Sequence, residues 1–261
     1  MPDPDSTDLV RYDLTGGRVT LTLDSPANRN ALSARLVGQL HEGLSAALDS
    51  PAVRVVVLTG AGPVFCSGAD LTERRTAPEA AAGAFSDVLL LILQAGKPVL
   101  CRLNGLARAG GIGLFAACDI VIAPRSATFA FTEVRLGLVP AVISVPVLRR
   151  LTVTAATELF MTGEVFDATR AERVGLVDRA VADEALDAEV DRYVDMLARG
   201  GPEAMGLVKQ MVATVTGRPP AEALPEMDAL SRQRFASAEA REGFTARAEK
   251  RDPDWYVAPP G

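Results

Sequence analysis

Two runs of small residues, 65–71 and 104–113, could bind negative charge through backbone N–H groups. Each run follows an apolar segment typical of a β-strand, and small side chains let a ligand approach the backbone closely. Gly110 and Gly111 precede an apolar helical turn, so their N–H groups are expected to be unpaired at a helix start, where they stabilise negative charge. Two such donors aimed at one atom would form an oxyanion hole. The alternative is that both runs are only tight turns.

One carboxylate, Glu133, follows a strand-like segment and lies among apolar residues. Apolar surroundings raise the pKa of a carboxyl group, which suits proton transfer near neutral pH. The alternative is an ion pair with Arg135 or Arg108 and no role in catalysis. Asp70 and Glu73 are weaker candidates, because Asp70 suits a helix cap and Glu73 lies in a polar segment that is expected to be exposed.

The histidine and cysteine content excludes other kinds of site. His41, the one histidine of the sequence, lies in an Ala- and Leu-rich helical segment and is expected to be partly exposed. Cys66, Cys101 and Cys118 lie in apolar segments without zinc-site spacing, and are expected to be reduced thiols in the core. A Ser-His-Asp triad would depend on His41. We therefore expect no metal site and a carboxylate as the proton-transfer group.

The overall composition narrows the class of protein. The 261 residues include 27 Lys and Arg and 33 Asp and Glu, and the net charge of −6 argues against a general nucleic-acid binder. The longest apolar run, 88–93, is far below the roughly 20 residues that span a bilayer. The N-terminal sequence MPDPDSTD is acidic and Pro-rich, unlike a signal or transit peptide. These features predict a cytoplasmic protein that does not contact membranes.

Strands and helices alternate in the first half of the sequence, which is typical of an α/β fold with parallel strands. We expect a hairpin at 10–14 and 18–23, strands at 53–58, 98–103 and 120–122, and helices at 33–49, 80–93 and 110–117. Ser33 is expected to cap its helix. Later helices are expected at 152–161, 183–197, 202–216, 221–235 and 239–251. This predicts a core at 1–195 and a helical region at 196–261 that packs on a neighbouring subunit.

The order of these motifs resembles the enoyl-CoA hydratase/isomerase (crotonase) superfamily from about Val10 to Lys250. The resemblance is carried by Gly68 to Leu71, Asn104-Gly105, Ala109 to Gly111, Cys118 to Ile120, Phe129 to Glu133 and Gly137 to Pro140. It implies a spiral of ββα repeats with a helical C-terminal region that forms trimers, which often pair into hexamers. It also implies an enzyme that acts on a coenzyme A thioester and needs no separate cofactor.

The resemblance also assigns ligand contacts. The segment from Ser67 through Asp70 to Leu71 would cradle the adenine end of coenzyme A. Arg29 and Lys250 would meet its phosphates, with Lys250 supplied by an adjacent subunit, and cationic side chains suit a polyanionic ligand. The implied substrate-binding set is Arg29, Ser67, Ala69, Asp70, Leu71, Gly110 and Lys250.

The catalytic roles that the resemblance implies include one departure from the family pattern. The N–H groups of Ala69 and Gly110 would stabilise a thioester enolate. Typical hydratases of the family carry two glutamates, one on each side of the double bond; Glu133 matches the second, and the first falls at Gly113. We expect reversible addition of water to a 2-enoyl-CoA with Glu133 as sole acid and base. The alternatives are double-bond isomerisation, or a CoA-ester binding protein with little turnover.

A narrower resemblance concerns the acyl group. The segments 110–114 and 132–144 are similar to bacterial hydratases of methylglutaconyl-CoA or isohexenylglutaconyl-CoA. Arg108 and Arg135 lie close in sequence to Gly110 and Glu133, so they could meet the distal carboxylate of such a substrate. They could instead pair with Glu133 or face solvent.

Overall fold

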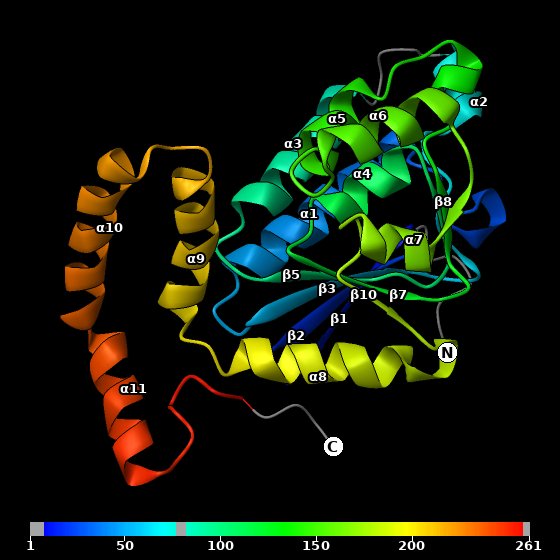
Figure 1. Cartoon of the computed structure of the whole chain (residues 1–261). Coiled ribbons are helices and arrows are strands. Elements are labelled where there is room, and N and C mark those ends of the chain that lie inside the picture. Colours follow the sequence, from blue (N-terminus) through cyan, green and yellow to red (C-terminus); the bar gives the residue numbers. More distant parts are fainter. Residues whose placement is uncertain (1–7, 77–81, 258–261) are drawn as a thin grey trace.

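Two mostly parallel sheets and the helices around them form the layered part of the molecule (Figure 1). The computed structural model describes residues 8–76 and 82–257. The larger sheet consists of β1 (Val10–Thr15), β2 (Arg18–Leu23), β3 (Val55–Gly60), β5 (Val99–Arg102), β7 (Ile120–Pro124) and β10 (Arg179–Val181), in that order. The smaller sheet consists of β4 (Val64–Cys66), β6 (Leu106–Arg108), β8 (Thr128–Ala130) and β9 (Phe166–Asp167), in that order.

The same succession of elements occurs three times along the chain. A strand of the larger sheet is followed by a strand of the smaller sheet and then by a helix: β3-β4-α2, β5-β6-α4 and β7-β8-η2. The helices are α2 (Leu71–Thr76), α4 (Gly110–Ala116) and the 3₁₀-helix η2 (Glu133–Leu136). Because β4, β6 and β8 are parallel neighbours, the three turns that follow them lie at one edge of the smaller sheet.

Helices cover both faces of the larger sheet, which explains its continuous apolar strands. All six residues of β3 are buried. Residues Val56 and Leu58 belong to the main core with α1 (Ala34–Asp49) and α3 (Ala82–Gln94), whereas Val55 and Val57 pack with α8 (Leu186–Ala198) on the opposite face. Burial on both sides is the physical reason for the unbroken hydrophobic run.

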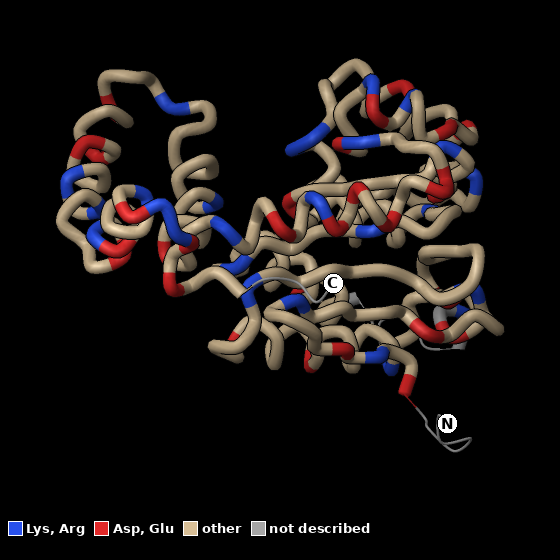
Figure 2. The backbone as a smooth tube through the Cα atoms, turned by 90° about the horizontal axis from the view of Figure 1, so that it is seen from below, with Lys and Arg blue, Asp and Glu red and all other residues tan. Residues whose placement is uncertain are grey.

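The C-terminal helices stand to one side of the layered part (Figure 1). They are α9 (Pro202–Val215), α10 (Pro220–Phe235) and α11 (Ala238–Glu249). Helix α9 is fixed by Lys209, whose Nζ lies 3.0 Å from Asp119 Oδ2 and donates to the carbonyl oxygen of Ile92 at 2.8 Å. Acidic and basic residues are interspersed along the chain rather than separated into large patches (Figure 2).

The α/β prediction is confirmed, and most predicted elements are present. The Ser33 hydroxyl accepts a hydrogen bond from the Leu36 N–H at 3.2 Å, as expected for the cap of α1. His41 is exposed on α1, and Cys66, Cys101 and Cys118 are buried and unpaired. Among the described residues, no helix is long and apolar enough to cross a membrane.

Several elements are not predicted from the sequence. The strands of the smaller sheet have two or three residues each, too few for an alternating pattern to be recognised. The sequence analysis also did not predict the short helices α5 (Ala141–Val147) and α7 (Ala168–Arg173). The division at residue 195 stays a prediction, and α8 runs past it to Ala198. The first seven residues and the predicted start of the helix at 80–93 lie outside the described residues.

Close packing of α4 on β4 gives a prediction about stability. A Cβ at Gly111 would lie 2.6 Å from the carbonyl oxygen of Cys66 and 2.8 Å from its Cβ. We expect Gly111→Ala to push α4 away from β4 and to lower the free energy of unfolding by about 1–3 kcal/mol, the usual cost of overpacking. Chemical denaturation measures this change.

The matched control is Gly38→Ala in α1, where nothing lies within 4 Å of the added Cβ. This substitution should raise the free energy of unfolding by roughly 0.5–1 kcal/mol, because alanine favours a helix interior over glycine. Equal effects of the two substitutions would contradict the close packing.

Candidate active site

The two runs of small residues touch each other. A Cβ on Gly68 would lie 3.2 Å from the Ala109 Cβ and 3.6 Å from the Gly110 nitrogen. Gly68 has φ +96°, which a residue with a side chain rarely adopts. The Leu32 N–H donates to the Gly68 carbonyl oxygen at 2.8 Å and fixes this loop. The structure therefore brings both runs to one place.

Two backbone N–H groups are free at this junction. Within residues 8–76 and 82–257, neither the Ala69 nor the Gly110 N–H donates a hydrogen bond to another residue. Gly110 is the first residue of α4, so its N–H has no partner inside the helix. Both residues line one cavity of about 490 Å³. An oxygen atom placed there could accept from both donors.

Ala109, the residue before α4, has a strained backbone that sequence reasoning missed. Its φ of 46° and ψ of −117° are uncommon for a residue with a side chain. The Ala109 N–H donates to the Ala130 carbonyl oxygen at 3.1 Å, and the Ala109 carbonyl oxygen accepts from the Ile112 N–H at 2.9 Å. These bonds on either side hold the conformation that presents the next N–H, that of Gly110. No property of alanine signals it in the sequence.

Glu133 begins η2 and lines the same cavity as Ala69 and Gly110. Its Oε2 atom is buried and has no hydrogen-bond partner among the described residues. Burial raises the pKa of Glu133 above its usual value, and a hydrogen bond from its own backbone N–H opposes part of this effect. The site therefore combines two donors for a developing oxyanion with one carboxyl group suited to moving a proton.

Arg108 neither lines this cavity nor pairs with Glu133. Its guanidinium donates to the carbonyl oxygens of Ala107 at 2.9 Å and Thr128 at 2.6 Å, so it is held along the strand. Arg135 is exposed and lies against Gly163, where a Cβ would be 3.1 Å from the arginine Nε. Neither arginine lines the cavity or pairs with a carboxylate within the described parts of the chain.

Gly113 has no room for a side chain. A Cβ there would lie 2.3 Å from the Cγ2 and 2.6 Å from the Cβ of Ile143, which is buried on α5. Ile143 also lines the cavity. Among the described residues that line it, Glu133 is the single charged one.

The remaining loop residues have clear structural contacts. The Ser67 N–H donates to the Arg29 carbonyl oxygen at 3.1 Å, which joins two predicted ligand contacts. Asp70 Oδ1 accepts from the N–H groups of Thr72 at 2.9 Å and Glu73 at 3.1 Å, so it caps α2 as the sequence suggests. Leu71, half exposed, lines the cavity. 

Two other residues named in the sequence analysis, Glu73 and Lys250, do not line the cavity. Glu73 is half-buried rather than exposed, because its Oε2 accepts from the Ala34 N–H at 2.8 Å and holds the start of α1. Lys250 ends α11, which lies on the opposite side of the molecule from α2 (Figure 1). One copy of the chain therefore does not bring Lys250 to the cavity.

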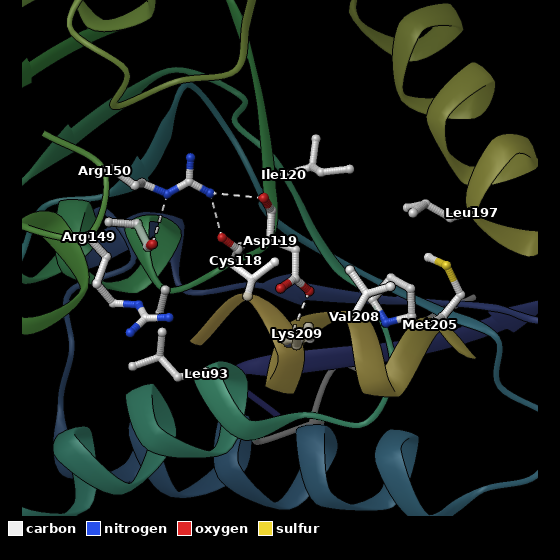
Figure 3. A pocket seen from close by; sticks show the side chains of 14 residues that line it. Leu93, Cys118, Asp119, Ile120, Arg149, Arg150, Leu197, Met205, Val208 and Lys209 are labelled. Atoms are coloured by element: carbon white, nitrogen blue, oxygen red, sulfur yellow. Dashed lines mark hydrogen bonds and ion pairs between the residues drawn. The ribbon is translucent and has the colours of Figure 1, made fainter. Parts of the chain in front are cut away.

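A second hollow of about 400 Å³ lies between α9 and the layered part (Figure 3). Three of its four charged side chains are engaged: Arg150 donates to the carbonyl oxygens of Ala116 and Cys118, at 2.9 and 2.5 Å, and Lys209 pairs with Asp119. The fourth, Arg149, is exposed. Burial raises the pKa of Asp119, although Lys209 favours its ionised form. These contacts fix the fold and leave no free acid or base there among the residues described.

Comparisons with known proteins agree with each other. The enoyl-CoA hydratase/isomerase family matches residues 15–257. A carnitinyl-CoA dehydratase from Citrobacter koseri is 33% identical over 252 residues, which cover 92% of this chain and 95% of the relative. The crystal structure of an enoyl-CoA hydratase from Mycobacterium smegmatis is 33% identical with a TM-score of 0.87, and covers 95% of this chain and 99% of that one. One from Bacillus anthracis is 30% identical with a TM-score of 0.89, covering 96% and 99%.

The buried carboxyl predicts a pH-dependent gain in stability for Glu133→Gln. Because the pKa of Glu133 is raised in the folded protein, its contribution is fully present below the ordinary pKa of 4.5 and is lost as the pH rises through the raised value. Glutamine does not ionise. The melting temperature of the variant relative to the unmodified protein should therefore be higher at pH 7 than at pH 4, as measured by thermal unfolding at both pH values.

The control is Glu42→Gln, which changes an exposed glutamate of α1. Its melting-temperature difference should be nearly the same at both pH values. If the melting-temperature difference between Glu133→Gln and the unmodified protein is also the same at both pH values, the Glu133 carboxyl group is not desolvated.

Proposed function

This chain belongs to the enoyl-CoA hydratase/isomerase family, and we propose that it adds water reversibly to the double bond of a 2-enoyl-CoA thioester. The observation that carries the proposal is the common cavity of the Ala69 N–H, the Gly110 N–H and the Glu133 carboxyl group. Hydratases and a CoA dehydratase among the relatives support this reaction class. A location in the cytoplasm stays a prediction.

The two N–H groups would bind the thioester carbonyl oxygen. Addition of water at the β-carbon moves negative charge onto this oxygen, and donors already in place stabilise it most in the transition state. Coenzyme A would lie along the loop from Ser67 to Leu71, with its phosphates near Arg29. Lys250 of a neighbouring subunit would add a second cation.

Glu133 would accept one proton and donate one proton during the addition of water. One carboxylate oxygen takes a proton from water as the oxygen of water bonds to the β-carbon. The same carboxyl group then gives a proton to the α-carbon as the enolate collapses, and it ends the cycle as a carboxylate. This requires addition of H and OH to one face of the double bond.

Isomerisation of the double bond is the second candidate, and the packing of Ile143 over Gly113 favours it. A single carboxyl that moves one proton along the chain suffices for isomerisation, whereas a second acid on the other side has no space here. A CoA-ester binding protein without turnover would be favoured by an ion pair that locks Glu133. Within the described residues Glu133 has no such pair.

We also propose that the protein is a homotrimer or a pair of trimers. The C-terminal helices expose many large apolar side chains, and such surfaces mark interfaces between subunits. The exposed residues are Val208, Met211, Val212, Val215, Leu224, Phe235 and Phe244. The hollow in Figure 3, which lies beside α9, has an apolar wall that a neighbouring copy could cover.

Activity assays test the role of Glu133. Glu133→Gln should lower turnover in the hydration of 2-butenoyl-CoA by about 10²–10⁴-fold, because amide nitrogen and oxygen cannot relay the protons. The affinity for a saturated acyl-CoA should change little. Hydration is followed by the loss of enoyl-thioester absorbance.

The control is Glu73→Gln, which keeps an oxygen to accept from the Ala34 N–H and should leave turnover little changed. Full activity of Glu133→Gln would rule out the proposed mechanism. An unmodified enzyme that converts 3-enoyl-CoA to 2-enoyl-CoA but does not hydrate the product would be an isomerase.

Deletion of residues 237–261 tests the assembly. It removes α11, whose Phe244 stacks on Phe235 of α10 with ring centroids 6.2 Å apart, and it removes Lys250. We expect smaller particles in analytical ultracentrifugation and weaker CoA binding together. A truncated protein with the full-length mass and unchanged CoA affinity would contradict this arrangement.

A further inference from the structure

The Arg108 side chain joins the two strands that lead to Gly110 and Glu133. Arg108 ends β6, two residues before Gly110, and β8 leads to Glu133. Its Nη1 atom donates to the Thr128 carbonyl oxygen at 2.6 Å, and its Nη2 atom donates to the Thr128 hydroxyl at 3.2 Å. One side chain therefore links the strand before an N–H donor of the candidate site to the strand before its carboxyl group.

The backbone pairing between these strands is short. Among the described residues, β6 pairs with β8 at two positions, Ala107 with Phe129 and Arg108 with Ala130. Directly after them, the Ala109 N–H donates to the Ala130 carbonyl oxygen at 3.1 Å. Because so few backbone bonds hold the two strands together, the bonds made by the Arg108 side chain are a large part of what fixes their spacing.

An arginine in this place has a cost that space filling alone does not explain. The Arg108 guanidinium is half-buried, and within the described parts of the chain no carboxylate pairs with it. Burial lowers the pKa of Arg108, as expected for a cation that leaves water without a counter-ion. An unbranched apolar side chain would fill the same space without this cost. What arginine adds is its hydrogen bonds to the oxygens of Ala107 and Thr128.

We infer that Arg108 is a positioning residue, which sets the distance between the Gly110 N–H and the Glu133 carboxyl group by fixing β6 against β8. Its effect on turnover rests on the proposed function. Arg108 does not line the cavity, so it acts through the two strands. Its charge is not the cause of the raised pKa of Glu133, which comes from burial. Position matters because a displacement of about 1 Å between reacting groups can lower turnover by roughly 10²-fold.

The Arg108→Met variant tests the inference, because it removes the donors and keeps an unbranched side chain. Turnover in the hydration of 2-butenoyl-CoA should fall by about 10- to 10²-fold. Affinity for butanoyl-CoA should change by less than about twofold, because the proposed contacts to coenzyme A remain. Arg108→Lys should restore part of the turnover, since an ammonium group can still donate to the Thr128 carbonyl oxygen. Full turnover of a folded Arg108→Met protein would overturn the inference.

The matched control is Arg54→Met, directly before β3. Arg54 is also half-buried, its Nη2 atom donates to the Gly200 carbonyl oxygen at 2.7 Å, and burial lowers its pKa. We expect this variant to lose stability to a similar extent in chemical denaturation and to keep its turnover. An equal loss of turnover in Arg54→Met and Arg108→Met would make the role of Arg108 merely structural and overturn the inference.

A double-mutant cycle shows whether Arg108 acts through Thr128. Thr128→Val removes the hydroxyl and keeps the carbonyl oxygen, so turnover should fall by about two- to fivefold, as expected for one lost hydrogen bond. Combined with Arg108→Met, it should add no further loss, because the contact is already absent. Losses that multiply would overturn the inference. If Arg108→Met does not fold, Thr128→Val and Arg108→Lys carry the test, and unchanged turnover in both would overturn it.

A measurement without substrate separates this inference from the proposed function. The gain in melting temperature that Glu133→Gln gives at pH 7 relative to pH 4 should be smaller in the Arg108→Met background, because a displaced carboxyl group is better hydrated. An equal gain in both backgrounds would overturn the inference and leave the reaction intact. A smaller gain in a protein that neither hydrates nor isomerises enoyl-CoA would remove the proposed function and support the fixing of Glu133 by Arg108.

Discussion

The parallel alignment of β4, β6 and β8 is the constraint on which the site depends. Each of these three-residue strands is followed by a turn that contributes one group: Ala69, Gly110 or Glu133. Strands of one sheet lie about 4.8 Å apart, so neighbouring turns are brought within the span of a small functional group. The alignment is fixed by very close backbone contacts. A Cβ at Gly105, for example, would lie 2.1 Å from the Pro63 carbonyl oxygen.

Two features of the site are unfavourable for stability. The backbone of Ala109 costs about 1–3 kcal/mol by its unusual conformation, and a buried oxygen without a partner, as in Glu133, costs a similar amount. Both features lie beside a closely packed core, whose burial offsets such costs. Phe115 of α4 packs edge-on against Phe129 of β8, with ring centroids 5.4 Å apart.

Sequence reasoning succeeded where a feature depends on neighbouring residues. The Ser33 and Asp70 caps and the location of Gly110 at a helix start follow from local patterns, and the structure contains all three. Sequence reasoning failed where the contacts of a side chain depend on a residue far away in the sequence. Arg108 lies two residues before Gly110, but its guanidinium donates to the Thr128 carbonyl oxygen on β8. The proximity of these two residues is set by strand pairing that three-residue segments do not reveal. The assigned roles of Arg29 and Lys250 remain predictions.

The contact between Gly113 and Ile143 also has a consequence for the evolution of this site. A carboxylate at position 113 would collide with Ile143, since even a Cβ would lie 2.3 Å from its Cγ2. A single mutation of Gly113 therefore disrupts α5 before it can change the chemistry, and space would first have to be made by a smaller residue at position 143. We therefore expect substitutions at positions 113 and 143 to be non-additive in stability: the change at position 143, which leaves a cavity between α4 and α5, has to come first.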